Sequence, residues 1–213
     1  MSRAESRKVQ ILKAAEKVFA RKGFPEATIS DVAREAKVSE ATIYEYFASK
    51  EELLFSIPGE TTQKGNEILA FHLNYVRGAA NKLRSIIYHY LMFYQDQEDY
   101  ASVIMLILKS NRNFIDTTAY QTVREGYRLI LKVIEEGVAS GEFKPDLNPY
   151  LIRSVILGTM EHLVTSRLMR GRWENLLDQV DPLTDLIIEG IKKDAKSRTW
   201  DLRITMEPSG EDK

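Results

Sequence analysis

The stretch TISDVAREAKVSEATIYEYFASKEEL, residues 28–53, carries the signals of two short helices, a tight turn and the start of a third helix. Thr28 stands where a hydroxyl caps a first helical turn, and Asp31 follows three residues later. Apolar residues then recur at helical spacing, and residues 36–38 leave room only for a tight turn. Ser39 is placed to cap a second short helix. The pattern therefore predicts a helix-turn-helix.

A Ser-x-x-Glu capping box, from Ser49 to Glu52, opens the third helix directly after this unit. In such a helix pair the second helix enters the major groove of DNA. Spacing alone leaves open a plain three-helix packing without a DNA role. Hydroxyl and ammonium groups on the outward face suit phosphate contacts, whereas groove-facing residues read bases. The residues expected to contact DNA are Thr28, Lys37, Ser39, Ala41, Thr42, Tyr44, Glu45, Tyr46 and Lys50.

The same stretch resembles the DNA-binding region of the TetR family of bacterial transcriptional regulators. With the preceding helix, the resemblance covers about 45 of the 213 residues. The matching segments are Ala27-Thr28-Ile29, Asp31-Val32-Ala33, Ala36-Lys37-Val38-Ser39, Ala41-Thr42-Ile43-Tyr44, Tyr46-Phe47 and Lys50-Glu51-Glu52-Leu53. It implies an all-α fold, with an N-terminal helix-turn-helix domain and a C-terminal helical domain for ligand binding and dimerisation.

Two positions modify this expectation. Lys37 stands where the family usually has Gly, so it must accept a strained left-handed backbone or use another turn, and it adds a cation near the DNA. Glu45 lies where family members vary with operator sequence. Facing the groove, a Glu accepts a hydrogen bond from cytosine. As a solvated residue, it would only repel phosphates, and both interpretations stand at this point.

Composition supports an ordinary globular protein, with 44% hydrophobic and 29% charged residues. The sequence contains no cysteine, which excludes disulfides and thiolate metal sites and is compatible with a cytoplasmic setting. We expect no secretory signal and no membrane span. The net charge of −1 is uneven, because residues 1–50 contain ten basic and seven acidic residues and the remainder carries a charge of −4. This modest asymmetry fits DNA binding at the N-terminal end.

Three segments are expected: a helix-turn-helix domain over residues 1–50, a helical domain over 51–195 and a mobile tail over 196–213. The first domain opens with a helix over residues 6–22 that ends at Gly23. In the second domain, helices are expected over 79–95, 100–109, 116–138, 149–170 and 181–193. Pro58 predicts a kink or short break early in the helix that starts at Lys50. That interruption is either a hinge between the domains or an irregular connection.

The segment from Tyr150 to Arg170 is apolar nearly all round, which is typical of a helix covered on two sides. Together with the amphipathic helix after Asp181, it predicts a two-fold four-helix interface in a homodimer. A dimer also places two reading heads on successive major-groove faces of a palindrome. The expected interface residues are Ile152, Val155, Gly158, Thr159, Leu163, Leu183, Leu186 and Ile187.

Aromatic, Met and polar residues within the helices of the second domain are candidates for lining an effector cavity. Core packing explains the same pattern for any one of them. The candidates are Tyr88, His89, Phe93, Met105, Asn111, Arg112, Arg124, Tyr127, Met160, Glu161 and His162. Residues 110–164 are also similar to TetR-family repressors of fatty-acid metabolism that respond to long-chain acyl-CoA. That likeness implies that Arg112 and Arg124 serve the CoA phosphates.

The three histidines show no metal-ligand spacing, and no motif supports catalysis, so no metal, no cofactor and no enzymatic activity are expected. The sequence therefore predicts a homodimeric transcriptional repressor that binds a palindromic DNA operator. A small hydrophobic effector, with long-chain acyl-CoA as the specific candidate, would release it. The alternative is an acyl-binding or other small-molecule-binding protein with a vestigial helix-turn-helix. Specific affinity for DNA separates the two.

Overall fold

The computed structural model describes residues 3–193, apart from the side chain of Glu60. This part of the chain is all-helical, as expected, and the sole pairing of extended backbone described in it is an isolated bridge between Phe143 and Lys192. None of the helices in the described part is long and apolar enough to cross a bilayer. The tail expected over 196–213 lies outside the described residues.

Three helices build the N-terminal head. They are α1 (Arg3–Glu26), α2 (Ile29–Ala36) and α3 (Glu40–Tyr44). Gly23 interrupts the helical backbone of α1 with φ 75°, which agrees with the expected end of the first helix. Ile11 and Phe19 of α1 are fully buried with Val32 of α2 and Ile43 of α3. Apolar burial thus holds α1, α2 and α3 together, with α2 packed against both of the others.

The second domain is built from longer helices and short connecting turns. They are α4 (Lys50–Leu73), α5 (Ala79–Asp96), α6 (Glu98–Ser102), the π-helix η1 (Val103–Leu108), the 3₁₀ turn η2 (Arg112–Asp116), α7 (Thr118–Ala139), α8 (Pro149–Arg170), the 3₁₀ turn η3 (Leu176–Gln179) and α9 (Val180–Ile191). The side chain of Asn148 accepts from Tyr150 N and Leu151 N at the start of α8, and Gly171 is left-handed at its end. The capping residues thus begin and end this helix as the sequence indicates.

At Pro58 a kink or a short break was expected, and the break does not occur. α4 runs without interruption from Lys50 to Leu73, with Pro58 inside it. Ile57 beside the proline is 3% exposed, and Leu53 and Leu54 one turn earlier are fully buried. Packing of this segment therefore keeps the helix whole, although proline removes one hydrogen bond of its ladder. One continuous helix leads from the head into the second domain.

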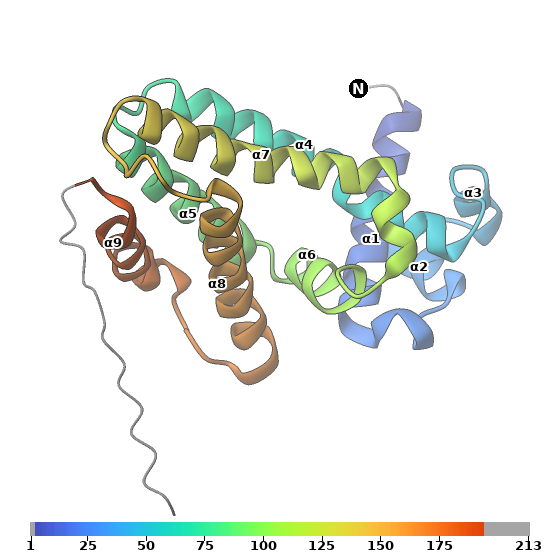
Figure 1. Ribbon diagram of the computed structural model, residues 1–213. Coiled ribbons are helices and arrows are strands. Elements are labelled where there is room, and N and C mark those ends of the chain that lie inside the picture. Colours follow the sequence, from blue (N-terminus) through green and yellow to red (C-terminus); the bar gives the residue numbers. More distant parts are fainter. Residues whose placement is uncertain (1–2, 194–213) are drawn as a thin grey trace, which may run out of the picture.

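Figure 1 shows the head at one end of the molecule, with α8 and α9 at the other end and α4 and α7 side by side between them. Two contacts join the head end of α4 to η2. The rings of Phe55 and Phe114 lie 5.8 Å apart, and Asn113 Nδ2 donates to Glu51 Oε1 at 3.3 Å. α6 and η1 pack against α1, so a second set of elements also couples the two domains.

Candidate DNA-reading face and ligand cavity

Side-chain caps start α2 and α3, and one left-handed residue makes the turn between them. Thr28 Oγ1 accepts from Asp31 N at 3.1 Å, and Asp31 Oδ2 accepts from Thr28 N at 3.2 Å. Ser39 Oγ accepts from Thr42 N at 3.0 Å and starts α3. Lys37 adopts φ 54° and ψ 46°, so it takes the left-handed conformation that glycine would adopt without strain. The helix-turn-helix is thus present as predicted, with its strain at Lys37.

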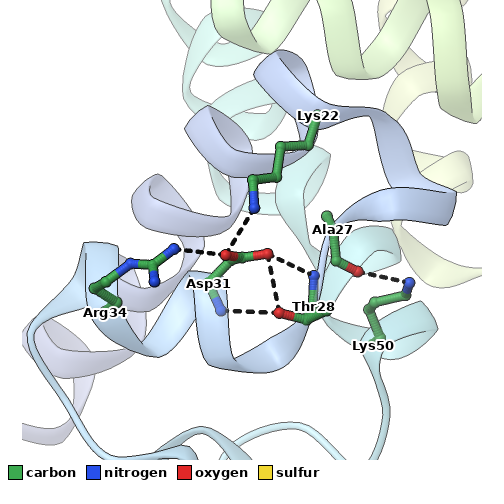
Figure 2. Close-up of polar contacts among 6 residues, drawn as sticks. All are labelled: Lys22, Ala27, Thr28, Asp31, Arg34 and Lys50. Atoms are coloured by element: carbon green, nitrogen blue, oxygen red, sulfur yellow. Dashed lines mark hydrogen bonds and ion pairs between the residues drawn. The ribbon is translucent and has the colours of Figure 1, made fainter.

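Asp31 is also the centre of an ionic cluster that fixes α2 on α1 (Figure 2). Its Oδ1 atom lies 2.8 Å from Lys22 Nζ and 2.6 Å from Arg34 Nη2. Hydrogen bonds from Lys22 and Thr28 hold the pKa of this carboxyl far below its ordinary range. The carboxylate therefore stays charged and keeps the start of α2 attached to the end of α1.

Lys50, which was expected to bind phosphate, makes contacts within the protein. Its Nζ atom donates to Phe24 O and Ala27 O, both at 2.8 Å, and lies 4.5 Å from the centre of the Phe24 ring. Figure 2 shows the contact with Ala27. These carbonyls belong to the link between α1 and α2, so the ammonium joins the start of α4 to the head. Lys50 therefore has a structural contact in this chain, and its expected phosphate contact stays a prediction.

The remaining predicted DNA residues lie on α3 and the turn. Ala41, Tyr44 and Glu45 are exposed, and Tyr44 is 54% exposed. Tyr46 is half-buried, with its ring 6.5 Å from that of Phe47. Lys37 is exposed at the turn. This surface therefore presents an ammonium, a phenol and a carboxylate outside the head.

An apolar cavity of about 250 Å³ lies in the second domain between α4, α5, α7 and α8. Its apolar walls include Leu69, Ile86, Phe93 and Ile130. Polar groups interrupt this lining, and they are Thr62, Asn66, His89, Tyr90, Tyr94, Asp96, Gln97 and Tyr127. An apolar cavity with a few polar groups is the usual form of a site for a small organic ligand.

Buried phenols give this cavity its polar character. Burial raises the pKa of Tyr90 and of Tyr94 well above the ordinary value, so both hydroxyls stay neutral. Tyr90 OH is buried without a hydrogen-bond partner among the described residues. A ligand that places a carbonyl or hydroxyl beside this atom would satisfy it. The cavity thus suits a largely apolar molecule that carries a polar group.

Comparison with known proteins gives matches over both domains. The family model of bacterial regulatory proteins of the tetR family matches residues 11–57, and that of the YsiA-like protein C-terminal region matches residues 66–190. The chain belongs to the TetR family of bacterial transcriptional regulators. The helix-turn-helix lies within the residues that the first model matches.

The relatives of this TetR-family chain include regulators of fatty-acid metabolism. It is 29% identical to the fatty acid metabolism regulator protein of Bacillus subtilis over 192 residues, which cover 90% of this chain and 98% of the relative. The structure of FadR from Bacillus subtilis in complex with stearoyl-CoA has a TM-score of 0.80 and 28% identity, and the match covers 86% of this chain and 98% of that one. The fatty acid degradation regulator FadR from Bacillus halodurans gives a TM-score of 0.79 at 27% identity, with 86% and 99% covered.

The predicted effector residues of this TetR-family chain separate into different places. His89, Phe93 and Tyr127 line the cavity. Arg124, Tyr127 and Glu161 line a second hollow between α7 and α8. Asn111 and Arg112 instead line an open cleft of about 700 Å³ against the end of α1. These two residues therefore lie at the junction with the head, away from the cavity, and their effector role stays a prediction.

Four other predicted effector residues line none of these hollows. Met160 is fully buried and Met105 is 7% exposed, so both belong to the core. Tyr88 is 40% exposed, and its ring lies 5.7 Å from that of His89. His162 is exposed on α8, with Nε2 3.3 Å from Ser166 Oγ. Helical spacing places a residue on one face of its helix, but it does not say which faces of neighbouring helices meet. It therefore cannot distinguish residues that line a cavity from residues of the core.

The predicted dimer residues also differ in burial. Val155, Gly158 and Leu186 are exposed, and Leu186 reaches 75%. Ile152 and Thr159 are half-buried. Leu163, Leu183 and Ile187 are 6–7% exposed within a single chain. These three side chains thus pack mainly within their own chain, and their place in a dimer interface stays a prediction.

Several lining residues escaped the sequence analysis. In the cavity they include Thr62, Asn66, Tyr90 and Tyr94, and in the second hollow they include Arg128, Tyr150 and Arg153. For Arg128 a signal existed, since it lies four residues after Arg124 and therefore on the same face of α7. Whether the other residues line a hollow depends on which helix they face, and the sequence alone does not give that packing.

Proposed function

We propose that this protein is a transcriptional repressor that binds a palindromic operator as a homodimer and leaves it when a long-chain acyl-CoA binds. The proposal rests on the position of α4, which reaches from the head to the cavity. Its first turn holds the head through Lys50, and its later residues Thr62, Gly65 and Leu69 line the cavity. A ligand in the cavity therefore contacts the helix that holds the reading head.

The acyl-CoA class is supported by the cavity and by a relative. The lining is mainly apolar, which suits a fatty-acyl chain, and Tyr90 offers a hydroxyl for a carbonyl oxygen. The FadR protein from Bacillus subtilis was solved in complex with stearoyl-CoA. Its likeness extends over the second domain of this chain, where the cavity lies.

Release from DNA follows if the ligand prefers one arrangement of the heads. A dimer fits successive major-groove faces only at one head spacing. A ligand that binds a different spacing more tightly shifts the population away from the DNA-binding state. A ligand with equal affinity for both states would change nothing. Proposed base-facing residues are Ala41 and Glu45, with Lys37 at the phosphate backbone.

Fluorescence anisotropy tests the proposal. The full-length protein is titrated onto labelled DNA from upstream of its own gene and onto fragments selected from the genome, with excess competitor DNA. We expect saturable binding to a palindrome and release by one range of acyl-CoA chain lengths. Specific binding that no acyl-CoA disturbs would keep the DNA role and refute this effector. No specific binding to any fragment would favour an acyl-binding protein with a vestigial helix-turn-helix.

A further inference from the structure

The hollow between α7 and α8 differs in chemistry from the apolar cavity. It measures about 730 Å³ and is open to solvent. Three arginines line it, with Arg124 and Arg128 on α7 and Arg153 on α8. The guanidinium carbon of Arg153 lies 5.4 Å from the centre of the Tyr150 ring. Arginine beside an aromatic face is a frequent arrangement where proteins bind phosphates and planar bases.

These three cations have no anionic partner in the described part of the chain. No ion pair there joins Arg124, Arg128 or Arg153 to a carboxylate, and the contact of Arg124 is a hydrogen bond of 3.5 Å to Gln121. Glu161 is the one acidic side chain in the lining, and it pairs with Lys109. The hollow therefore keeps a positive potential that favours a ligand with several negative charges.

The hollow and the cavity are neighbours. Tyr127 and Leu157 line both of them, so these two side chains form the boundary that a ligand occupying both would have to cross. Such a ligand would have an apolar chain on one side and a polyanionic group on the other. A free fatty acid carries a single charge and leaves two arginines unpaired. A CoA thioester carries three phosphates and an adenine.

We infer that the hollow between α7 and α8 holds the nucleotide of an acyl-CoA, with its phosphates on Arg124, Arg128 and Arg153 and its adenine near Tyr150. This inference rests on the proposed effector class and adds the site of its charged part. It also assigns to Arg128 and Arg153 the phosphate contacts that the family resemblance implied for Arg112. Guanidinium groups bind phosphates through paired, charge-assisted hydrogen bonds, so their loss removes affinity for the nucleotide alone.

Isothermal titration calorimetry of the full-length protein tests this site. The probes are CoA thioesters of increasing chain length, the free fatty acid of the best-bound length, and CoA itself. We expect the variant Arg128→Ala/Arg153→Ala to bind the thioester on the order of tenfold or more weakly. Binding of the free acid should change by less than about twofold, because the apolar cavity is untouched. Lys132→Ala, an exposed change on α7 outside the hollow, is the control and should match the wild type.

The outcomes separate the inference from the proposed function. Thioester binding that survives both arginine changes would overturn the nucleotide site and leave the effector class standing. An equal loss for thioester and free acid would also overturn it, because the change would then act on the cavity. If no thioester binds the wild type, the effector class fails and the inference fails with it. Partial recovery in Arg128→Lys/Arg153→Lys would support a charge-based role.

Discussion

Lys50 occupies a position that suggests DNA contact, and its ammonium makes stabilising contacts within the protein. Its ammonium lies against two carbonyl oxygens and the face of Phe24 at the link between α1 and α2. We predict that Lys50→Ala lowers the free energy of unfolding by about 1.5–3 kcal/mol, as expected for hydrogen bonds from a charged group. Urea denaturation measures this. Lys13→Ala, an exposed change on α1, is the control and should have little effect.

Lys37 is the contrasting cation, because it is exposed at the turn and held in a left-handed conformation. Glycine adopts that conformation without strain, so Lys37→Gly should stabilise the protein by about 1 kcal/mol. The same change removes a proposed phosphate contact and should reduce the salt dependence of operator binding by about one unit of slope. Anisotropy at several salt concentrations measures the slope. An unchanged slope would remove Lys37 from the DNA contact.

Asp31 makes the stability of the head depend on pH. Its pKa is depressed in the folded protein, so its stabilisation is complete above the ordinary value of 3.8 and is lost as the pH falls through the folded value. Thermal unfolding of the wild type and of Asp31→Asn should therefore differ most near neutral pH. We expect the difference to shrink as the pH drops below the ordinary value. A difference that stays constant with pH would contradict the charged network.

At the scale of elements, α7 and α5 approach closely at Gly137. A Cβ atom built there would lie 2.1 Å from the ring of Phe143, which is 1% exposed, and 2.8 Å from Ala79 Cβ. Gly137→Ala should therefore destabilise the protein by about 1–3 kcal/mol through overpacking. Gly59→Ala in α4 is the matched control, since nothing lies within 4 Å of its Cβ position. That change should stabilise by about 0.5–1 kcal/mol, as measured by urea denaturation.

The elements themselves were largely predictable, because caps are local. Thr28, Ser39, Ser49 and Asn148 each accept a backbone hydrogen bond at the helix start that the sequence indicated. The short break that Pro58 suggested does not occur, because burial around it outweighs its local effect on the helix. The residues of the proposed nucleotide site were less predictable. The family resemblance indicated Arg124 alone among its three arginines. Arg153 needed knowledge of how α8 faces α7, which only the packing gives.

At the scale of the whole molecule, the exposed parts of α8 and α9 suit a second copy of the chain. Leu186 is 75% exposed, and Leu151 and Val155 are 59% and 49% exposed. We predict that Leu186→Glu converts the proposed dimer into a monomer, because the buried carboxylate would be costly at the interface. Analytical ultracentrifugation measures the mass, and operator affinity should fall with it, since a monomer reads one half-site.

A matched change on another surface controls for this experiment. Phe71 on α4 is 64% exposed and lies outside the proposed interface. Phe71→Glu should therefore leave the protein dimeric. Dimers of Leu186→Glu, or monomers of Phe71→Glu, would place the interface elsewhere.

The most direct measurement of the central claim is the thermodynamic linkage between DNA and acyl-CoA. Operator affinity is measured with and without saturating acyl-CoA, and acyl-CoA affinity with and without saturating operator. If a ligand in the second domain controls the reading heads, each affinity must fall by the same factor, which we expect to be at least about fivefold. Independent binding, with neither affinity changed by the other ligand, would contradict the account of an acyl-CoA-controlled repressor.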